Sequence, residues 1–481
     1  MNNFKRYTFL KTFVVIIASL VSLANHASAT QAYEVLRSTR GNYKSYPRVI
    51  QLLVKDKLYF ASIPYVKEYL FRNRGKSNKE LDDLIDVIVS EVGIKQFEVM
   101  PASTIASSTA PMLKYILAKK YFRSGKYKDT LRTLNKAIPS DHPAKPFSLY
   151  LEGSAFSLMG NKDSAVSSYK RCVKESDSQK SDYKSDPNRV RQLEINRDYC
   201  IVGIARTQFA KKDFDEANLS YLDLEKSSYI WPEILFEEAW NSFYLKDYNR
   251  TLGKLVTYKA PVLKFIFNPE IDVLRALTYM ELCLWNDTKN VVNDFYKQYT
   301  SDHSKLRGFL AKHGKDYKYY YLLMKSYSKG TSSGNILLDR YIKGIRNDPA
   351  YREMFLSFSK GRDEIQKVKS LSRGNAQAVF LKNLKDSLVL QRDLLGAYVR
   401  KGINQYTSQL SKAFEGMSYI KLEVLARKKA ILYNTQYKGV RARGNINNLK
   451  RNEKQYFWTF NGEFWADELG DYVFSLKPEC N

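Results

Sequence analysis

The sequence predicts an all-α protein in which an α-solenoid of helical hairpins is followed by a region of long helices. Small and aromatic residues recur at a spacing close to 34 residues between positions 111 and 300, which is typical of stacked helix pairs. Apolar residues recur at helical spacing in the last third of the chain, which has no proline between Pro349 and Pro478. Apolar residues form 44% of the 481 residues, enough for packed cores and too many for wholesale disorder.

Residues 1–29 have the pattern of a secretory signal peptide. Three basic residues among the first eleven precede an apolar stretch over 12–24, which is too short for a relaxed membrane span. Ala27-Ser28-Ala29 then forms a small-residue cleavage motif. We expect cleavage before Thr30 and export to the periplasm, with an uncleaved anchor helix as the alternative.

The first copy of the repeat follows residue 111. Its small and large apolar positions are Leu117, Ala118, Tyr121, Gly125, Tyr127, Leu134 and Ala137. This spacing resembles the tetratricopeptide repeat (TPR), in which a small residue lets the first helix of a pair approach the second closely. The TPR family implies protein–protein scaffolding without a cofactor.

Four further copies follow at nearly the same spacing. Their small and aromatic positions are Gly153, Phe156, Gly160, Ala165 and Tyr169, then Ala205, Phe214, Ala217 and Tyr221, then Ala239, Tyr248 and Leu255, then Ala276, Tyr279, Trp285 and Phe295. Between the second and third copies, residues 174–193 are rich in Ser, Asp and Lys and include Pro187, which predicts a surface loop. The TPR-like region therefore spans 111–300, with an insertion at 174–193.

Helical segments flank this region. Residues 30–110 have apolar residues at helical spacing and are expected to form an N-terminal cap or degenerate repeats, since the end of a solenoid otherwise exposes an apolar face. The repeat pattern fades after residue 300, so 301–375 is expected to be a helical connector.

Residues 376–437 show an apolar heptad pattern. It runs from Leu381 to Tyr398 and, after a shift of frame near Gly402, from Ile403 to Ile431. The pattern predicts long helices that either fold into an intramolecular hairpin or pair with a second copy as a homodimeric coiled coil.

The C-terminal tail, 438–481, is first basic and then aromatic. Six of the ten residues in 456–465 are aromatic, and so many rings either dock on the body of the protein or mark a binding surface. Docking is the expected outcome. It would bring the end of the chain back to the fifth repeat.

Four cysteines remain after export to an oxidising compartment, which allows two disulfides. Stacked repeats bring the end of the second repeat to the start of the third, so we expect Cys172 to pair with Cys200. Docking of the tail makes Cys283 and Cys480 the other pair. Four buried free thiols are the alternative.

The tail and Trp231-Pro232-Glu233, which opens the fourth repeat, resemble a group of exported TPR proteins in predatory and gliding delta-proteobacteria. The resemblance covers roughly residues 195–300 and 455–480. Some members of that group are linked to envelope machinery such as gliding motility, which implies an envelope role for this chain.

The sequence contains few residues in patterns that are typical of catalytic sites. Beyond the signal peptide only His142, His303 and His313 remain, and no HExxH motif or histidine beside a plausible nucleophile is present. The acidic cluster Asp82, Asp83 and Asp86 is typical of a solvated helix face rather than a metal site. We therefore expect a non-enzyme without cofactor or metal.

What remains is a surface for partners. In a TPR array, fixed positions of the first helix of each pair line the concave face, and aromatic and basic residues favour peptide binding there. Mapped by the resemblance, these positions are Tyr115, Lys119, Phe122, Arg123, Tyr150, Tyr199, Arg206, Phe209, Phe236, Trp240, Phe243 and Tyr244. The alternative is that the C-terminal helices of the chain itself fill this groove.

The net charge of +28, or +25 after loss of the three basic residues of the signal, favours acidic protein partners, lipid headgroups or anionic envelope polymers. Because we expect the protein to be exported, we do not expect nucleic acid as its partner. The sequence thus predicts a periplasmic, non-catalytic scaffold that binds envelope proteins, with a cell-wall or anionic glycan-binding module as the rival.

Overall fold

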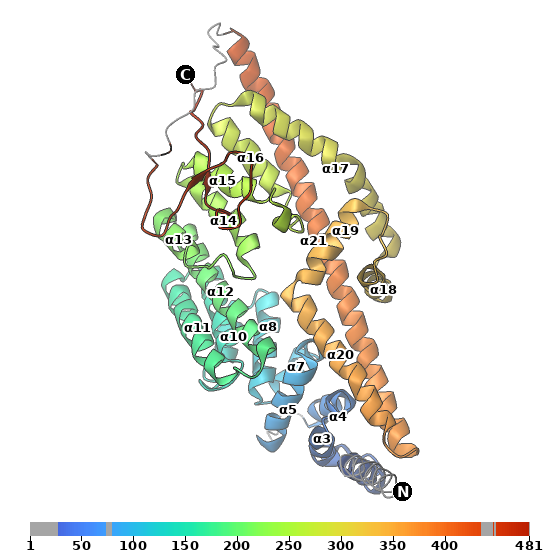
Figure 1. The fold of residues 1–481 in the computed structure, drawn as a ribbon. Coiled ribbons are helices and arrows are strands. Elements are labelled where there is room, and N and C mark those ends of the chain that lie inside the picture. Colours follow the sequence, from blue (N-terminus) through green and yellow to red (C-terminus); the bar gives the residue numbers. More distant parts are fainter. Residues whose placement is uncertain (1–26, 74–78, 434–445, 447–448, 481) are drawn as a thin grey trace, which may run out of the picture. The chain divides into compact units, whose positions relative to one another are not determined.

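The computed structural model describes residues 27–73, 79–433, 446 and 449–480 (Figure 1). Within them the protein is helical apart from two strands of two residues each, which confirms the all-α prediction. The proposed signal peptide lies outside the described residues as far as position 26, and its last residues open the first described helix, α2. Among the described residues no helix is long and apolar enough to cross a bilayer.

The chain divides into two compact units, and the first combines residues 1–144 with 349–395. Its helices are α2 (Ala27–Ser38), η1 (Tyr43–Ser45), α3 (Tyr46–Lys55), α4 (Tyr59–Arg72), α5 (Lys79–Val92), α6 (Lys95–Glu98), α7 (Ala102–Ala106), α8 (Pro111–Arg123), α9 (Tyr127–Leu134), α20 (Pro349–Lys369) and the first part of α21 (Asn375–Tyr433). The first TPR-like hairpin, α8–α9, belongs to this unit.

A buried carboxylate fastens α20 to α4 in the first unit. Glu364 is 3% exposed, and its two oxygens accept hydrogen bonds from the backbone N–H groups of Phe60 and Ala61, both at 2.9 Å. These N–H groups lie in the first turn of α4 and have no partner within the helix. Gly361, one turn earlier in α20, leaves room for the Phe60 ring. Residues 303 and 304 positions apart are thus joined at a helix N-terminus.

The second unit combines residues 145–348 with 396–481. Its elements are α10 (Lys145–Leu158), α11 (Lys162–Asp182), α12 (Pro187–Ala210), α13 (Phe214–Tyr221), α14 (Trp231–Tyr244), α15 (Tyr248–Thr257), η2 (Pro261–Leu263), α16 (Glu270–Glu281), α17 (Trp285–His313), α18 (Tyr317–Ser328), α19 (Ile336–Asn347), the rest of α21, β1 (Trp458–Thr459) and β2 (Tyr472–Val473). Helices adjacent in sequence pack together in pairs from α10 to α17 (Figure 1), as in a TPR-like solenoid. The expected connector 301–375 is instead divided between the two units.

Two glycines show why small residues recur in the hairpins. The Tyr169 ring of α11 lies against Gly153 of α10 and Gly203 of α12, where an added Cβ would stand 2.8 and 2.6 Å from ring atoms. Only glycine therefore admits this ring without a shift of the helices. Cys172, one turn along α11, forms the expected disulfide with Cys200 of α12.

The insertion 174–193 is not the predicted surface loop. Helix α11 continues to Asp182, and α12 already begins at Pro187, a position where proline costs no hydrogen bond. The Asp186 side chain caps α12 by accepting hydrogen bonds from the next two free N–H groups. The extended helices bury polar side chains against each other, as in the hydrogen bond from Asn196 to Ser176. Because this helix interface is polar, its amino-acid composition is like that of a surface loop.

Helix α21 is one continuous helix of 59 residues, so the predicted hairpin within 376–437 is wrong. The shift of frame near Gly402 does not mark a turn. An added Cβ at Gly402 would stand 2.7 Å from Ile345 of α19, and at Gly396 only 1.8 Å from the Tyr317 carbonyl oxygen. These glycines are sites of close approach to other helices.

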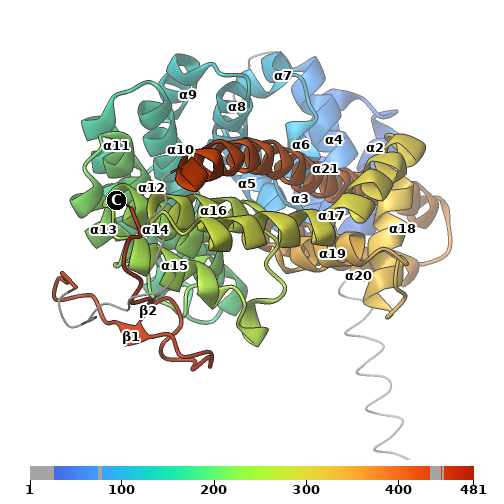
Figure 2. The ribbon, with the colours of Figure 1, turned by 90° about the horizontal axis from the view of Figure 1, so that it is seen from above.

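In the second unit the apolar stripe of α21 packs within the chain rather than against a second copy. Phe414 contacts Phe295 of α17, and Tyr406 contacts Tyr341 of α19 at a ring-centroid distance of 5.0 Å. Figures 1 and 2 both show this part of α21 running beside α16 and α17. The face expected to form a coiled coil is therefore occupied over these residues.

The tail docks on the second unit, as expected. We call residues 468–480 the strap. Strands β1 and β2 pair in parallel, with Trp458 opposite Tyr472, and β2 lies on α15 (Figure 1). The strap ends in the predicted disulfide between Cys283 and Cys480.

Candidate functional site

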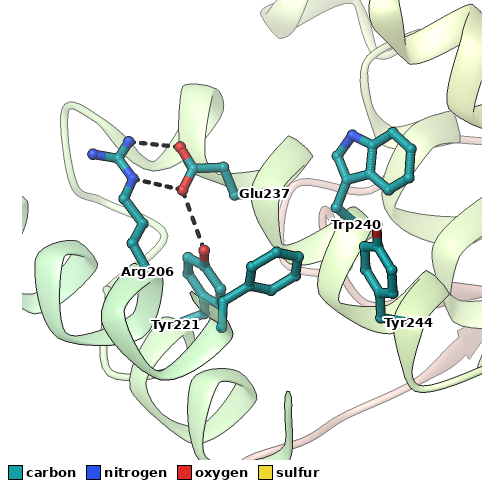
Figure 3. A pocket seen from close by; sticks show the side chains of 6 residues that line it. Arg206, Tyr221, Glu237, Trp240 and Tyr244 are labelled. Atoms are coloured by element: carbon teal, nitrogen blue, oxygen red, sulfur yellow. Dashed lines mark hydrogen bonds and ion pairs between the residues drawn. The ribbon is translucent and has the colours of Figure 1, made fainter. Parts of the chain in front are cut away.

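A pocket of about 290 Å³ opens on the second unit between α12, α13 and α14 (Figure 3). Its lining residues come from three consecutive helices: Arg206, Phe209, Tyr221, Glu237, Trp240 and Tyr244. Four of these six, all except Tyr221 and Glu237, belong to the concave face that the repeat register predicts. Helical spacing of three or four residues places each pair on the same side of its helix.

The polar side of the pocket is an ion pair between successive hairpins. The Nε and Nη2 atoms of Arg206 donate to the two carboxylate oxygens of Glu237 at 2.8 and 2.6 Å. Tyr221 donates a third hydrogen bond to the same carboxylate at 3.2 Å. Figure 3 shows the remaining guanidinium nitrogen of Arg206 pointing away from Glu237. The bidentate geometry fixes the guanidinium in one orientation.

The local charges act on these groups in opposite ways. Burial disfavours the charged guanidinium, but the hydrogen bonds and charge of Glu237 outweigh it and raise the pKa of Arg206. Burial, followed by the negative charge of Glu237, raises the pKa of Tyr221. Arg206 therefore stays charged and Tyr221 stays a neutral hydrogen-bond donor.

The apolar side of the pocket is aromatic. Phe209 meets Tyr244 edge to face at a centroid distance of 5.3 Å, and Trp240 lies 6.0 Å from Tyr244. Phe214 stacks on Tyr244 at a centroid distance of 5.1 Å. Half of the Tyr244 side chain remains exposed. The rings are thus supported by one another while presenting surface to a ligand.

Phe236 and Phe243, also predicted for the concave face, have packing roles here. Phe236 is buried in a cluster with Ala239, Leu255 and Leu274. Phe243 packs against this cluster and contacts the Trp240 ring at 5.6 Å. They hold Trp240 in place from within α14 and do not line the pocket.

Tyr150 and Tyr199 lie together on the same unit, with a ring distance of 6.1 Å. Burial above all raises the pKa of Tyr199, and the charges of Glu233 and Asp348 add to this rise. Tyr398 of α21 lies close enough to interact electrostatically with Tyr199, and it donates a hydrogen bond to Asp348 at 2.8 Å. Tyr398 of α21 therefore lies near Tyr199 on this unit, whereas none of the residues that line the pocket comes from α21.

The four predicted residues of the first repeat lie in the other unit and form a separate group. Arg123 pairs with Glu98 of α6 at 2.7 Å, and Lys119 lies 3.8 Å from the same carboxylate and over the Tyr115 ring. Burial, partly offset by the charge of Glu98, lowers the pKa of Lys119 to about 8. Phe122 contacts the following helix through Tyr127. These contacts hold α8 against α6.

Glu237 and Tyr221 are the pocket residues that the concave-face prediction missed. Tyr221 was recognised only as a repeat position in the second helix of its hairpin. Glu237 follows the buried Phe236 and pairs with Arg206, 31 residues earlier. A search for opposite charges separated by about one repeat would have found this pair.

The lining residues offer aromatic faces, a fixed guanidinium and one carboxylate already engaged by it. The residues described contain no group of three or more His, Cys, Asp or Glu side chains placed to hold a metal ion.

Comparisons with known proteins add the following. No family model and no curated protein matches the sequence. Among solved structures, the chain is similar to one titled "Structure of Naa15/Naa10 bound to HypK-THB", at 13% identity and a TM-score of 0.27, over 80% of this chain and 61% of that one. It is also similar to "Crystal structure of APC/C hetero-tetramer Cut9-Hcn1", at 9% identity and a TM-score of 0.20, over 83% and 94% of the two chains. This chain thus spans 61% of the length of the first. At these scores neither likeness bears on function.

The class of protein therefore follows from the chain's own structure. It is an all-α protein of tandem TPR-like hairpins, followed by one long helix and a docked strap.

Proposed function

We propose that the chain is a non-catalytic scaffold of the bacterial cell envelope that binds protein partners through the inner face of its TPR-like hairpins. The observation that carries the proposal is the pocket between α12 and α14. Its Trp, Tyr and Arg side chains are those that most often dominate binding energy at protein interfaces. Arg206 is oriented by Glu237 before any partner arrives, so little conformational entropy is lost on binding.

The compartment is part of the proposal. Two disulfides, Cys172–Cys200 and Cys283–Cys480, are compatible with an oxidising compartment such as the periplasm. The signal pattern of residues 1–29 and the resemblance to exported TPR proteins of gliding bacteria support the same location. We assign the scaffold to an envelope-assembly or motility complex on this basis.

The test is a crosslinked affinity purification of the tagged mature protein from its native envelope. Trp240→Ala removes the largest aromatic wall of the pocket, whereas Trp465→Ala removes an equally large but exposed ring elsewhere on the same unit. We expect a defined set of envelope proteins that is lost with Trp240→Ala and kept with Trp465→Ala. Recovery of the same proteins with both variants would refute the pocket as the binding site.

A second candidate function is binding of cell-wall or anionic glycans. Tyr456, Trp458 and Trp465 are 66%, 47% and 57% exposed on the docked tail, which leaves three large rings in water. Purified cell-wall polysaccharide that retains the wild type but not Trp458→Ala/Trp465→Ala would favour this function. If the polysaccharide retained both forms equally, its binding would depend on the charge of the protein and not on these rings.

A further inference from the structure

The main chain of the strap forms several hydrogen bonds to α15. Asn249 of α15 accepts from the Phe474 N–H through its carbonyl at 3.1 Å. Its side-chain amide accepts from the Leu476 N–H at 2.9 Å and donates to the Leu476 carbonyl at 3.1 Å. Two turns further along α15, the Thr257 hydroxyl accepts a hydrogen bond from the Gly470 N–H at 3.1 Å. Such contacts hold an extended backbone in place, while pockets for its side chains provide selectivity.

Glycines let the strap approach the helices closely. An added Cβ at Gly253 of α15 would stand 1.5 Å from the Tyr472 carbonyl oxygen. An added Cβ at Gly470 of the strap would stand 2.7 Å from the Trp231 ring of α14. The Gly253 side of the helix is thus shaped to receive another backbone.

The surface under the strap is apolar. Tyr472 and Leu469 join a buried cluster that includes Trp231 and Leu235, while Phe474 and Leu476 pack against a second cluster that contains Leu252, Leu282 and Leu284. Without the strap these side chains would form a contiguous exposed patch, which soluble proteins keep for binding.

The two disulfides differ in access. Cys172 and Cys200 are both completely buried, whereas Cys480 is exposed at the end of the strap. A thiolate must reach a sulfur atom to open a disulfide. A dithiol reductant would therefore attack the Cys283–Cys480 bond first. It would leave one thiol on each of the two cysteines and would itself be oxidised to a disulfide.

We propose that the surface of α14, α15 and the α16–α17 turn beneath the strap is a binding surface for an extended peptide, which the strap occupies in cis and the Cys283–Cys480 disulfide keeps closed. This surface, the strap seat, is distinct from the pocket. Its partner is an extended segment with the pattern glycine, any residue, aromatic, apolar, aromatic, as in residues 470–474. The seat becomes available to such a segment once the disulfide is reduced.

The experiment uses a fluorescent peptide of residues 468–479 as the probe and three forms of the full mature chain. These are the oxidised wild type, the wild type treated with a dithiol, and the strap-weakened variant Tyr472→Ala/Cys283→Ser/Cys480→Ser. We expect the peptide to bind the second and third forms at least about tenfold more tightly than the first, because a strap fixed by the disulfide as well as by its main chain competes at a higher effective concentration than one held by its main chain alone. Alkylation and mass spectrometry should show Cys172–Cys200 intact after the dithiol treatment.

Matched glycine substitutions locate the binding. Gly253→Ala, added to the strap-weakened variant, should abolish peptide binding, whereas Gly308→Ala in α17, where an added Cβ meets nothing within 4 Å, should not. Hydrogen exchange of the strap reports whether it has left the seat. Equal binding to the oxidised and opened forms, no binding to a form with a mobile strap, or a strap that stays protected after reduction would each overturn the proposal. So would reduction of both disulfides together.

Discussion

Replacement of Glu364 by glutamine should remove a pH dependence from the stability of the first unit. Burial above all raises the pKa of Glu364 to about 7 from its usual 4.5, even though the backbone N–H groups of Phe60 and Ala61 act in the opposite direction. Because the folded state holds the proton more tightly, this carboxyl stabilises the unit most below pH 4.5 and progressively less as the pH rises to about 7. At about 1.4 kcal/mol per pKa unit, the loss is about 3 kcal/mol.

Hydrogen exchange of peptides from α4 is the appropriate assay, because a chain of two units need not unfold in one step. Wild type and Glu364→Gln are compared at equal pH between 4.5 and 8, so that the intrinsic exchange rates cancel. We expect the protection of the wild type to fall relative to the variant by up to about a hundredfold over this range. Parallel curves for the two proteins would refute the reasoning.

Glu98 provides a control of opposite sign. Burial opposes its charge, but Lys95, Lys119 and Arg123 outweigh that effect and lower its pKa. Its contribution to stability is therefore present above its unfolded pKa and is lost as the pH falls through the folded one. The difference in protection between Glu98→Gln and the wild type should therefore stay constant between pH 4.5 and 8 and shrink only when the comparison is extended below pH 4.5. A change in this difference only above pH 7 would contradict this assignment.

Two further predictions concern the second unit. Gly203→Ala should lower the stability of the second unit by about 1–3 kcal/mol, because the new Cβ would meet the buried Tyr169 ring at 2.6 Å. Gly308→Ala should instead raise the stability of this unit by about 1 kcal/mol through helix propensity alone. Thermal unfolding midpoints that shift in the same direction for both variants would contradict the close contact. Lys254→Met should cost about 3–5 kcal/mol, because it strands the buried carboxylate of Glu238, 2.7 Å away. Adding Glu238→Leu should restore most of the loss in chemical denaturation, and a double variant no more stable than the single one would exclude a stranded charge as the cause.

The repeat register could be predicted from the sequence because it depends on residue size at fixed spacing. The predicted small position Gly153 marks where Tyr169 contacts α10. The Cys172–Cys200 pairing follows from how repeats stack, and the Cys283–Cys480 pairing follows from docking of the tail. The same register identified Arg206, Phe209, Trp240 and Tyr244 of the pocket. It could not identify Glu237, because the partner of Arg206 depends on the offset between successive hairpins rather than on either helix alone.

The two errors of the fold prediction have related causes. Residues 174–193 have the polar composition of a loop, yet Ser176 and Asn196 bond to each other inside a helix pair. Gly402 has the position of a turn in a broken heptad, yet it admits Ile345 to the surface of a continuous helix. In both cases a residue type that favours a break lies at a contact with a neighbouring helix, which composition alone does not reveal.

The course of α21 limits what kind of partner the pocket accepts. Burial, with the charge of Glu233 at the start of α14 as the next contribution, raises the pKa of Tyr406 to about 12. Tyr406 of α21 therefore lies near Glu233 at the start of α14, while the pocket is lined by the second half of α14. A partner helix that ran from the pocket along α14 to Glu233 would meet α21, whose glycines at 396 and 402 are fitted to other helices. A short segment that inserts one or two apolar side chains beside Trp240 requires no such rearrangement, and the volume of about 290 Å³ suits it. Affinity would then depend on that anchor, so substitutions at Trp240 should outweigh substitutions at Tyr150 or Tyr199.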